Sequence, residues 1–200
     1  MNNKIIVSLF ACATATAALA ANLTPENFAG ISAGATHYTN TSSFARPNTS
    51  ITANTDNVGF GFKAFGGTWL NDNFGAEIGY VDFGKKKSSL KGAVSGNQEE
   101  RVNAFYAAGL AGHKFENKSR VYGKLGVYNA GLKTNTVIAG VNTINSNSRN
   151  TGLYFGAGYS YPITETISLR AEAERFYKVG NSSTGKKNVN FYSIGATYQF

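Results

Sequence analysis

Residues 74–80 read FGAEIGY, and the character of the side chain changes at every position. Apolar residues occupy positions 74, 76, 78 and 80, while glycine or glutamate stands between them. Side chains of a β-strand point alternately to opposite faces, so this stretch predicts a strand with one apolar face and one small or charged face. The same period of two recurs on both sides of it and decides the fold class.

Seven further segments alternate in this way: 31–36, 60–70, 102–113, 121–128, 153–161, 167–174 and 192–200. The phase is ambiguous only in 102–113, where two sets compete for the outward face. One set is Val102, Ala104, Tyr106, Ala108 and Leu110, and the other is Phe105, Ala107, Gly109 and Ala111. We favour the first set as the outward face.

The connections between these segments alternate in length. Those near 71–73, 115–119 and 162–166 are short, whereas 38–57, 83–101, 131–151 and 176–188 are long and polar. Short turns at one end and long loops at the other are typical of an outer-membrane barrel with the long loops outside. A soluble sandwich or lipocalin-like barrel also alternates, but here one face stays apolar to both strand ends. The sequence therefore predicts an all-β, eight-stranded, antiparallel, up-and-down transmembrane β-barrel.

Composition agrees with one domain of short strands. The 200 residues include 23 glycines, 14 phenylalanines and 11 tyrosines but only one cysteine, with a formal charge of +8. This bias excludes a collagen, a disulfide framework and a zinc ribbon.

The first 20 residues form a separate segment. Lys4 precedes a short apolar run, and Ala18-Leu19-Ala20 gives a small-residue cleavage pattern, which together predict a secretory signal peptide over 1–20. The barrel domain is then 21–200, and Cys12 is removed with the signal. No later stretch approaches the roughly 18 consecutive apolar residues of a transmembrane helix.

Charged residues fall on the face expected to line the lumen. Strand phase directs three basic and three acidic residues inward: Lys63, Lys124, Arg170, Glu77, Glu172 and Glu174. Balanced charge suits a narrow lumen, where an unpaired ion costs several kcal/mol. We expect either a gate across a small pore or an ion core that fills the barrel, and the second is favoured because eight strands leave room only for side chains.

Three stretches resemble a known family, the small eight-stranded outer-membrane barrels typified by the OmpA transmembrane domain. They are AFGG at 64–67 with FGAEIGY at 74–80, YSYPIT at 159–164 continuing through Ile167, Arg170 and Glu172, and SIGATYQF at 193–200. The resemblance covers the mature chain but not its loops, and segment 102–113 lacks the family's inward basic residue. It implies that Glu77, Lys124, Arg170 and Glu172 match the family's internal ion network. Wall anchoring is not implied, because the periplasmic peptidoglycan-binding domain is not found in this sequence.

The end of the chain also resembles that family. Ile194, Tyr198 and Phe200 are similar to its terminal signature, which implies recognition by the barrel assembly machinery.

Catalysis is not expected. Some small outer-membrane barrels are lipid-modifying enzymes, but a hydrolase needs a histidine beside a serine and a carboxylate. The mature chain offers only His37 and His113, in different segments. Two distant histidines without cysteine do not supply a metal site, and no cofactor is expected.

The long loops are basic. They carry Lys85, Lys86, Lys87, Lys91, Lys186 and Lys187. We expect these cations to meet lipopolysaccharide phosphates, with host polyanions or receptors as further partners and nucleic acid excluded by the outer-membrane compartment. Three functions remain: a structural or adhesive surface barrel, which we favour, a small passive pore, and a lipid-modifying enzyme.

Overall fold

The computed structural model describes residues 25–40, 52–55, 58–91, 96–138, 141–179 and 187–200. The predicted signal peptide at 1–20 lies outside these ranges. The strands are β1 (Glu26–Asn40), β2 (Thr52–Thr55), β3 (Val58–Trp69), β4 (Phe74–Lys91), β5 (Gly96–Lys114), β6 (Arg120–Ile138), β7 (Val141–Pro162), β8 (Ile167–Val179) and β9 (Lys187–Gln199). Within the described ranges, no helix has the length and apolar character needed to cross a membrane.

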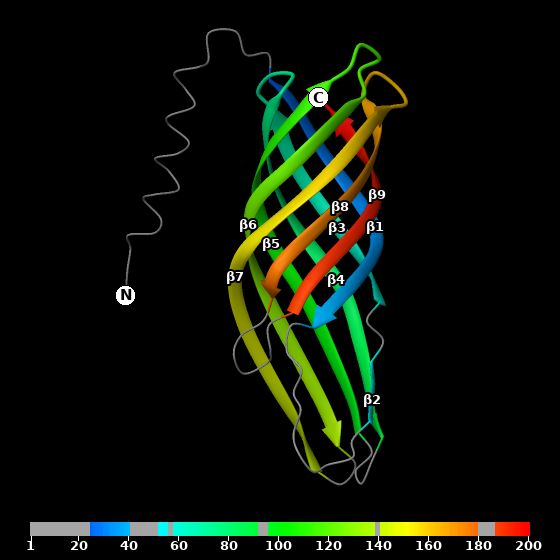
Figure 1. Ribbon diagram of the computed structural model, residues 1–200, viewed down its shortest axis with the longest axis vertical. Coiled ribbons are helices and arrows are strands. Elements are labelled where there is room, and N and C mark those ends of the chain that lie inside the picture. Colours follow the sequence, from blue (N-terminus) through cyan, green and yellow to red (C-terminus); the bar gives the residue numbers. More distant parts are fainter. Residues whose placement is uncertain (1–24, 41–51, 56–57, 92–95, 139–140, 180–186) are drawn as a thin grey trace, which may run out of the picture.

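Eight of these strands form one closed antiparallel barrel (Figure 1). The order β4-β3-β1-β9-β8-β7-β6-β5 closes because β4 also pairs with β5, from Phe74 opposite Ala111 to Leu90 opposite Gly96. The short strand β2 adds to the far end of β4. Closure leaves the eight wall strands without an unpaired edge, as a lipid environment requires. The predicted fold class is therefore confirmed.

Short turns close three hairpins at one end of the barrel, which we call the short-turn end (Figure 1). Polar side chains fix these turns locally. The Oδ1 atom of Asn71 accepts the N–H of Phe74 at 2.7 Å, and Oγ1 of Thr164 accepts the N–H of Ile167 at 2.9 Å. Asn117 does the same for Ser119 at 3.1 Å. All three predicted short turns are present.

The opposite end, which we call the long-hairpin end, differs from the expectation of long loops. Strands β4 and β5 stay paired as far as Leu90 opposite Gly96, and β6 and β7 as far as Ile138 opposite Val141. The predicted loops 83–101 and 131–151 are therefore mostly paired strand. The sequence of these extensions is mostly polar and lacks the apolar alternation that revealed the strands within the wall.

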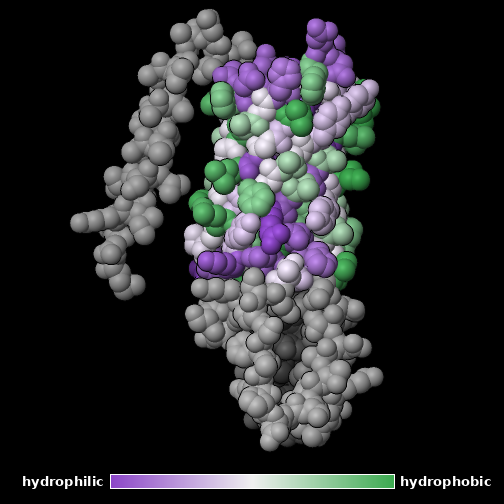
Figure 2. Space-filling model, viewed as in Figure 1, coloured by the Kyte–Doolittle hydropathy of each residue, from purple (hydrophilic) through white to green (hydrophobic). Residues whose placement is uncertain are grey.

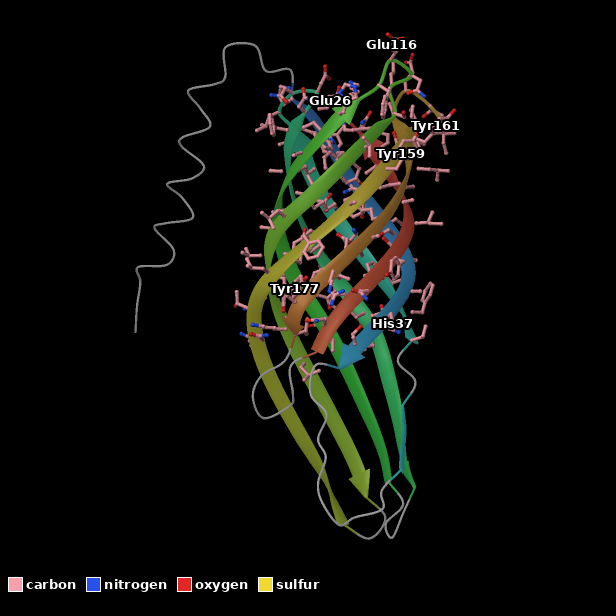
Figure 3. The ribbon with its side chains drawn as sticks, viewed as in Figure 1. Glu26, His37, Glu116, Tyr159, Tyr161 and Tyr177 are labelled. Atoms are coloured by element: carbon pink, nitrogen blue, oxygen red, sulfur yellow. The ribbon has the colours of Figure 1, made fainter. Side chains whose placement is uncertain are left out.

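Side chains alternate between the lumen and the outer surface. On β3, Phe60 and Phe62 are 62% and 60% exposed, whereas the next residue, Lys63, points into the lumen and is only 1% exposed. Figure 2 shows apolar residues distributed over the middle of the wall and hydrophilic ones gathered at the short-turn end. In Figure 3, Tyr159 and Tyr161 lie near the short-turn end and Tyr177 lies farther along the wall. Aromatic girdles at two levels are typical of the outer surface of such barrels.

The phase that we favoured for β5 is wrong. Val102, Ala104, Tyr106, Ala108 and Leu110 are buried inside the barrel, and Phe105 is 68% exposed on its surface. Both sets are apolar, so alternation alone could not separate them. The lumen contacts decide the phase, because the Tyr106 hydroxyl donates to a carboxylate at the barrel centre.

Candidate functional site: the filled lumen

The barrel interior brings together all six charged residues that strand phase directed inward. Lys63 comes from β3, Glu77 from β4 and Lys124 from β6, while β8 supplies Arg170, Glu172 and Glu174 at every second position. Their side chains are at most 4% exposed. We call this group the lumen ion cluster.

Each carboxylate of the lumen ion cluster meets at least two cations. Lys124 lies centrally, with Nζ 2.7 Å from Glu77 Oε1, 2.5 Å from Glu172 Oε1 and 3.2 Å from Glu174 Oε1. Lys63 contacts Glu172 and lies 2.7 Å from Glu174 Oε2. Three positive and three negative groups therefore balance within one network.

Arg170 joins the two sides of the cluster. Its guanidinium donates to Glu77 from Nη2 and to Glu172 from Nε, the latter at 2.8 Å. The same guanidinium lies 4.4 Å from the centre of the Phe65 ring, within the range of a cation–π contact. Charge-assisted hydrogen bonds and a ring face together compensate for the water that Arg170 has lost.

Tyrosine hydroxyls occupy further acceptor positions on the carboxylates. Tyr106 donates to Glu77 and Tyr122 donates to Glu172, each at 2.8 Å. Without these bonds, lone pairs of buried carboxylates would remain unsatisfied at a cost of about 1–3 kcal/mol each.

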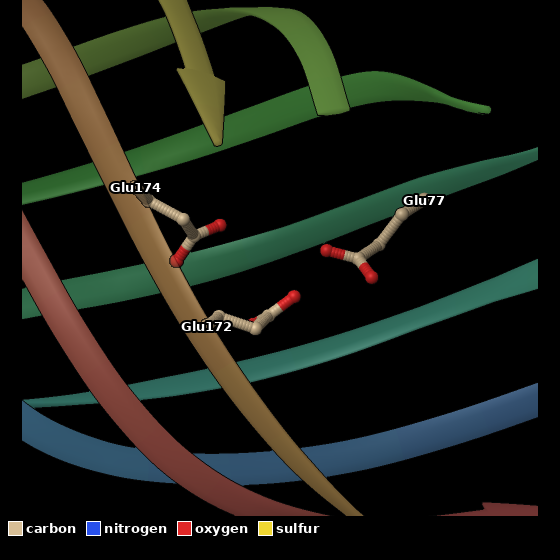
Figure 4. A group of neighbouring side chains, drawn as sticks. All are labelled: Glu77, Glu172 and Glu174. Atoms are coloured by element: carbon tan, nitrogen blue, oxygen red, sulfur yellow. The ribbon is translucent and has the colours of Figure 1, made fainter. Parts of the chain in front are cut away.

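The three glutamates alone have the spacing of a cation site, as Figure 4 shows. Their oxygen atoms lie within 4.8 Å of one another. Yet ammonium and guanidinium groups already contact all three carboxylates. A divalent ion would have to displace Lys63, Lys124 or Arg170 and leave that cation buried without a partner, so the cluster is a completed salt-bridge network.

An aromatic layer lies beyond the lumen ion cluster, toward the long-hairpin end. Its rings belong to Phe83, Tyr128, Tyr154, Phe176 and Phe191, each at most 1% exposed. The rings of Tyr154 and Phe176 stack at 4.8 Å with an interplanar angle of 5°. Phe83 contacts Phe176 edge-on at 4.9 Å and Phe191 at 6.0 Å.

Sequence reasoning missed most of this layer. It placed Phe83 and Phe176 in loops and began the last strand at Tyr192, one residue after Phe191. A signal was present, because Phe83 and Phe176 each continue the inward phase set by earlier residues of β4 and β8. The polar residues that follow them concealed it.

A cavity of about 410 Å³ opens at the short-turn end of the lumen. Arg120 stacks over Trp69 at 3.9 Å in its wall, and Nη2 of Arg120 lies 3.3 Å from Glu26 Oε2. Lys114 also contacts Glu26. The floor of this vestibule includes Arg170, so the lumen ion cluster closes it from below.

The other predicted site residues are not part of the lumen ion cluster. Ile194 and Tyr198 are outward residues of β9, 69% and 54% exposed, and Phe200 follows that strand at 71%. Lys85, Lys86, Lys87 and Lys91 belong to the extended part of β4, and Lys187 begins β9. Lys186 lies outside the described residues.

The two histidines of the chain are far apart. His37 lies on β1 opposite Val58, toward the long-hairpin end (Figure 3), whereas His113 on β5 precedes a short turn. Both are exposed. They do not converge on a common site.

Known proteins of the same kind share this sequence pattern and this fold. The sequence profile of the OmpA-like transmembrane domain matches residues 24–200. Outer membrane protein A of Klebsiella pneumoniae is 28% identical over 152 residues, which make up 73% of this chain and 42% of that protein. The chain thus spans less than half the length of this relative.

Solved barrels superpose on most of the chain. OprG of Pseudomonas aeruginosa gives a TM-score of 0.54 at 14% identity, covering 88% of this chain and 95% of its own. Neisserial surface protein A gives 0.53 at 18%, covering 86% and 97%. Ail of Yersinia pestis, solved with the heparin analogue sucrose octasulfate, gives 0.52 at 16%, covering 88% and 99%. These likenesses concern the fold, whereas the profile match identifies the family: the chain belongs to the OmpA-like transmembrane domain family and is a β-barrel of the bacterial outer membrane, embedded among its lipids.

Proposed function

We propose that this protein is a structural barrel of the outer membrane with a closed lumen, and that its long-hairpin end faces the outside of the cell. The observation that carries the proposal is the filled cross-section. The lumen ion cluster and the aromatic layer lie one above the other, and both consist of side chains that are almost fully buried.

Passage of a hydrated ion would require both layers to open. An eight-stranded barrel has an interior only just wide enough for its own side chains. Separating Arg170 from Glu77 and Glu172 would leave charges uncompensated at low dielectric, which costs several kcal/mol. The aromatic layer would remain as a second, apolar barrier.

A comparison of cells with and without the protein tests the structural role against the pore. A structural barrel predicts that deleting the gene increases sensitivity to detergent and entry of hydrophobic dyes, and that the wild-type gene restores resistance. A pore predicts slower uptake of small hydrophilic solutes instead. Slower uptake with an unchanged detergent threshold would contradict the structural role.

The closed barrel also supports a non-enzymatic role. A lipid-modifying hydrolase needs its nucleophile, base and acid within hydrogen-bond reach of one another. His37 and His113 lie toward opposite ends of the barrel, and the buried carboxylates are held by cations rather than by a histidine.

A second function, binding of polyanions, is supported by the charge of the long-hairpin end. The backbone register of β4 and β5 sets Lys85 opposite Arg101, whereas Lys86 and Lys87 stand opposite Glu100 and Glu99. In this register Lys85, unlike Lys86 and Lys87, has no acidic residue directly opposite it. The structure of Ail with a heparin analogue concerns another member of this fold and favours the same ligand class.

Heparin affinity chromatography tests this second function. Replacing Lys85 and Lys91 by glutamine should lower the salt concentration needed for elution, because exposed charges are screened by salt. The column is loaded with intact cells that display the barrel, so only the outward-facing end reaches the heparin. The matched control replaces Lys114 and Lys118 at the short-turn end by glutamine and should leave the salt concentration needed for elution unchanged. Equal retention of the Lys85 and Lys91 variant would contradict polyanion binding.

A further inference from the structure

The vestibule at the short-turn end is a second polar site, and the lumen ion cluster separates it from the rest of the barrel. Its volume of about 410 Å³ falls in the range of pockets that hold small molecules. Apart from Arg170, which is paired within the lumen ion cluster, three basic and two acidic residues line it: Lys114, Lys118, Arg120, Glu26 and Glu165. Three positive and two negative charges leave an excess of one positive charge.

Arg120 is buried in the wall of the vestibule but incompletely paired. Its side chain is 5% exposed, and its guanidinium lies 3.9 Å from the centre of the Trp69 ring. Within the described part of the chain, its one ion pair runs from Nη2 to Glu26 Oε2 at 3.3 Å, and Nε has no hydrogen-bond partner. Arg170, in contrast, donates to carboxylates from both Nε and Nη2. The Arg120 guanidinium therefore retains donor capacity that the described residues do not use.

Glu26 is shared between two cations at the short-turn end (Figure 3). Lys114 Nζ contacts its Oε1 atom, whereas Arg120 approaches Oε2. The Glu26 side chain is 35% exposed, so water also competes for these oxygen atoms. A further carboxylate, that of Asp72, lies 3.8 Å from Lys114 and is 73% exposed. A second anion inside the vestibule would complete the pairing of Arg120 and Lys114.

We propose that the vestibule binds a small carboxylic acid with an apolar body, whose carboxylate is held by Arg120 and Lys114. The planar guanidinium matches two carboxylate oxygens, and the ammonium group adds another donor. One negative charge neutralises the excess of one positive charge, whereas a dianion such as phosphate would exceed it. Phe28 and Tyr122 line the same cavity and offer apolar surface to the rest of the ligand. This site goes beyond the structural role and does not depend on it.

Isothermal titration calorimetry of the folded barrel in nonionic detergent tests the site, with N-acetylphenylalanine as the probe and its uncharged amide as the reference. The wild type should bind the acid but not the amide. Arg120→Gln should weaken binding of the acid about tenfold, as expected for the loss of one charge-assisted hydrogen bond, and Arg120→Lys should retain part of it. The matched control is Arg175→Gln on β8, outside the vestibule, which should bind like the wild type.

Glu26→Gln gives a prediction of opposite sign. It removes the carboxylate that competes for Arg120 and Lys114, so it should strengthen binding of the acid severalfold, whereas a variant that only disturbs the fold would weaken it. Heat-dependent migration on a denaturing gel identifies the folded variants.

Three results would overturn the proposal. They are absence of wild-type binding, equal binding of acid and amide, and equal affinity in the wild type, Arg120→Gln and Glu26→Gln. Tighter binding of inorganic phosphate than of the acid would overturn the assignment of a carboxylate. None of these results bears on the detergent sensitivity of cells, so failure of this site is distinct from failure of the structural role.

Discussion

Arg170 contacts carboxylates on two strands, Glu77 on β4 and Glu172 on β8, and its guanidinium also lies over the Phe65 ring. Arg170→Ala leaves Glu77 and Glu172 with one cation fewer in a buried site, and we expect a loss of about 3–5 kcal/mol in the free energy of unfolding. Urea unfolding in lipid vesicles measures it. The exposed Arg149→Ala variant should change stability little, and an equally small effect at Arg170 would contradict its role in the cluster.

Gly84 lies within the bulge of β4, between Asp82 and Lys85, and has a φ of 78°, a conformation that other residues adopt at a cost of about 1–2 kcal/mol. A Cβ atom there would also stand 2.1 Å from the Phe60 carbonyl oxygen. Gly84→Ala should therefore destabilise the barrel by more than 1 kcal/mol. At Gly123 the nearest atoms to such a Cβ are 3.9 Å away, so Gly123→Ala is the control. Equal unfolding midpoints for the two variants would be inconsistent with strain at Gly84.

Strand phase predicted the inward direction of the residues of the lumen ion cluster, because Lys63, Glu77 and Arg170 interrupt otherwise apolar or small-residue patterns. It did not include Arg120, which is buried in the vestibule. Phe83 and Phe176 continue the inward phase of β4 and β8, but the polar residues that follow them concealed that the strands extend that far. An aromatic residue is compatible with either face of a membrane barrel, so its type carries no information about direction. Only the pairing of neighbouring strands fixes where these rings meet.

Strands β6 and β7 show why the long hairpins were not predicted. Beyond Leu132 the two strands remain paired as far as Ile138 opposite Val141, although the sequence there shows no apolar alternation. Backbone hydrogen bonds between strands suffice to hold such an extension. Composition alone cannot distinguish it from a loop, since the same polar residues serve both.

The extension of β6 and β7 should be dispensable for the barrel wall. Replacing residues 135–145 by a two-residue Asn-Gly turn joins Thr134 to Ser146 across their existing register. We expect the free energy of unfolding to change by no more than about 0.5 kcal/mol, as for other surface changes. A barrel that no longer shows heat-dependent migration on a denaturing gel would indicate that the extension is part of the folding unit.

At the level of the whole molecule, the end of β9 is predicted to direct assembly into the membrane. Phe200 is exposed, and its backbone N–H donates to the Asn27 carbonyl oxygen at 3.0 Å, next to the first strand. Deleting Phe200 should lower the amount of folded protein in the outer membrane of growing cells. Phe115→Ala removes another exposed ring at the short-turn end and should not. Equal yields of the two variants would remove the assembly role.

The closed lumen is tested most directly by single-channel recording of the wild-type chain in planar lipid bilayers. A barrel filled by the lumen ion cluster and the aromatic layer predicts no stepwise current in potassium chloride, whereas Arg170→Ala combined with Phe176→Ala predicts that steps emerge. Buried ion pairs are screened little by salt, so the wild type should stay closed as the salt concentration is raised. Reproducible wild-type current steps that increase with salt concentration would contradict a closed barrel and indicate a pore.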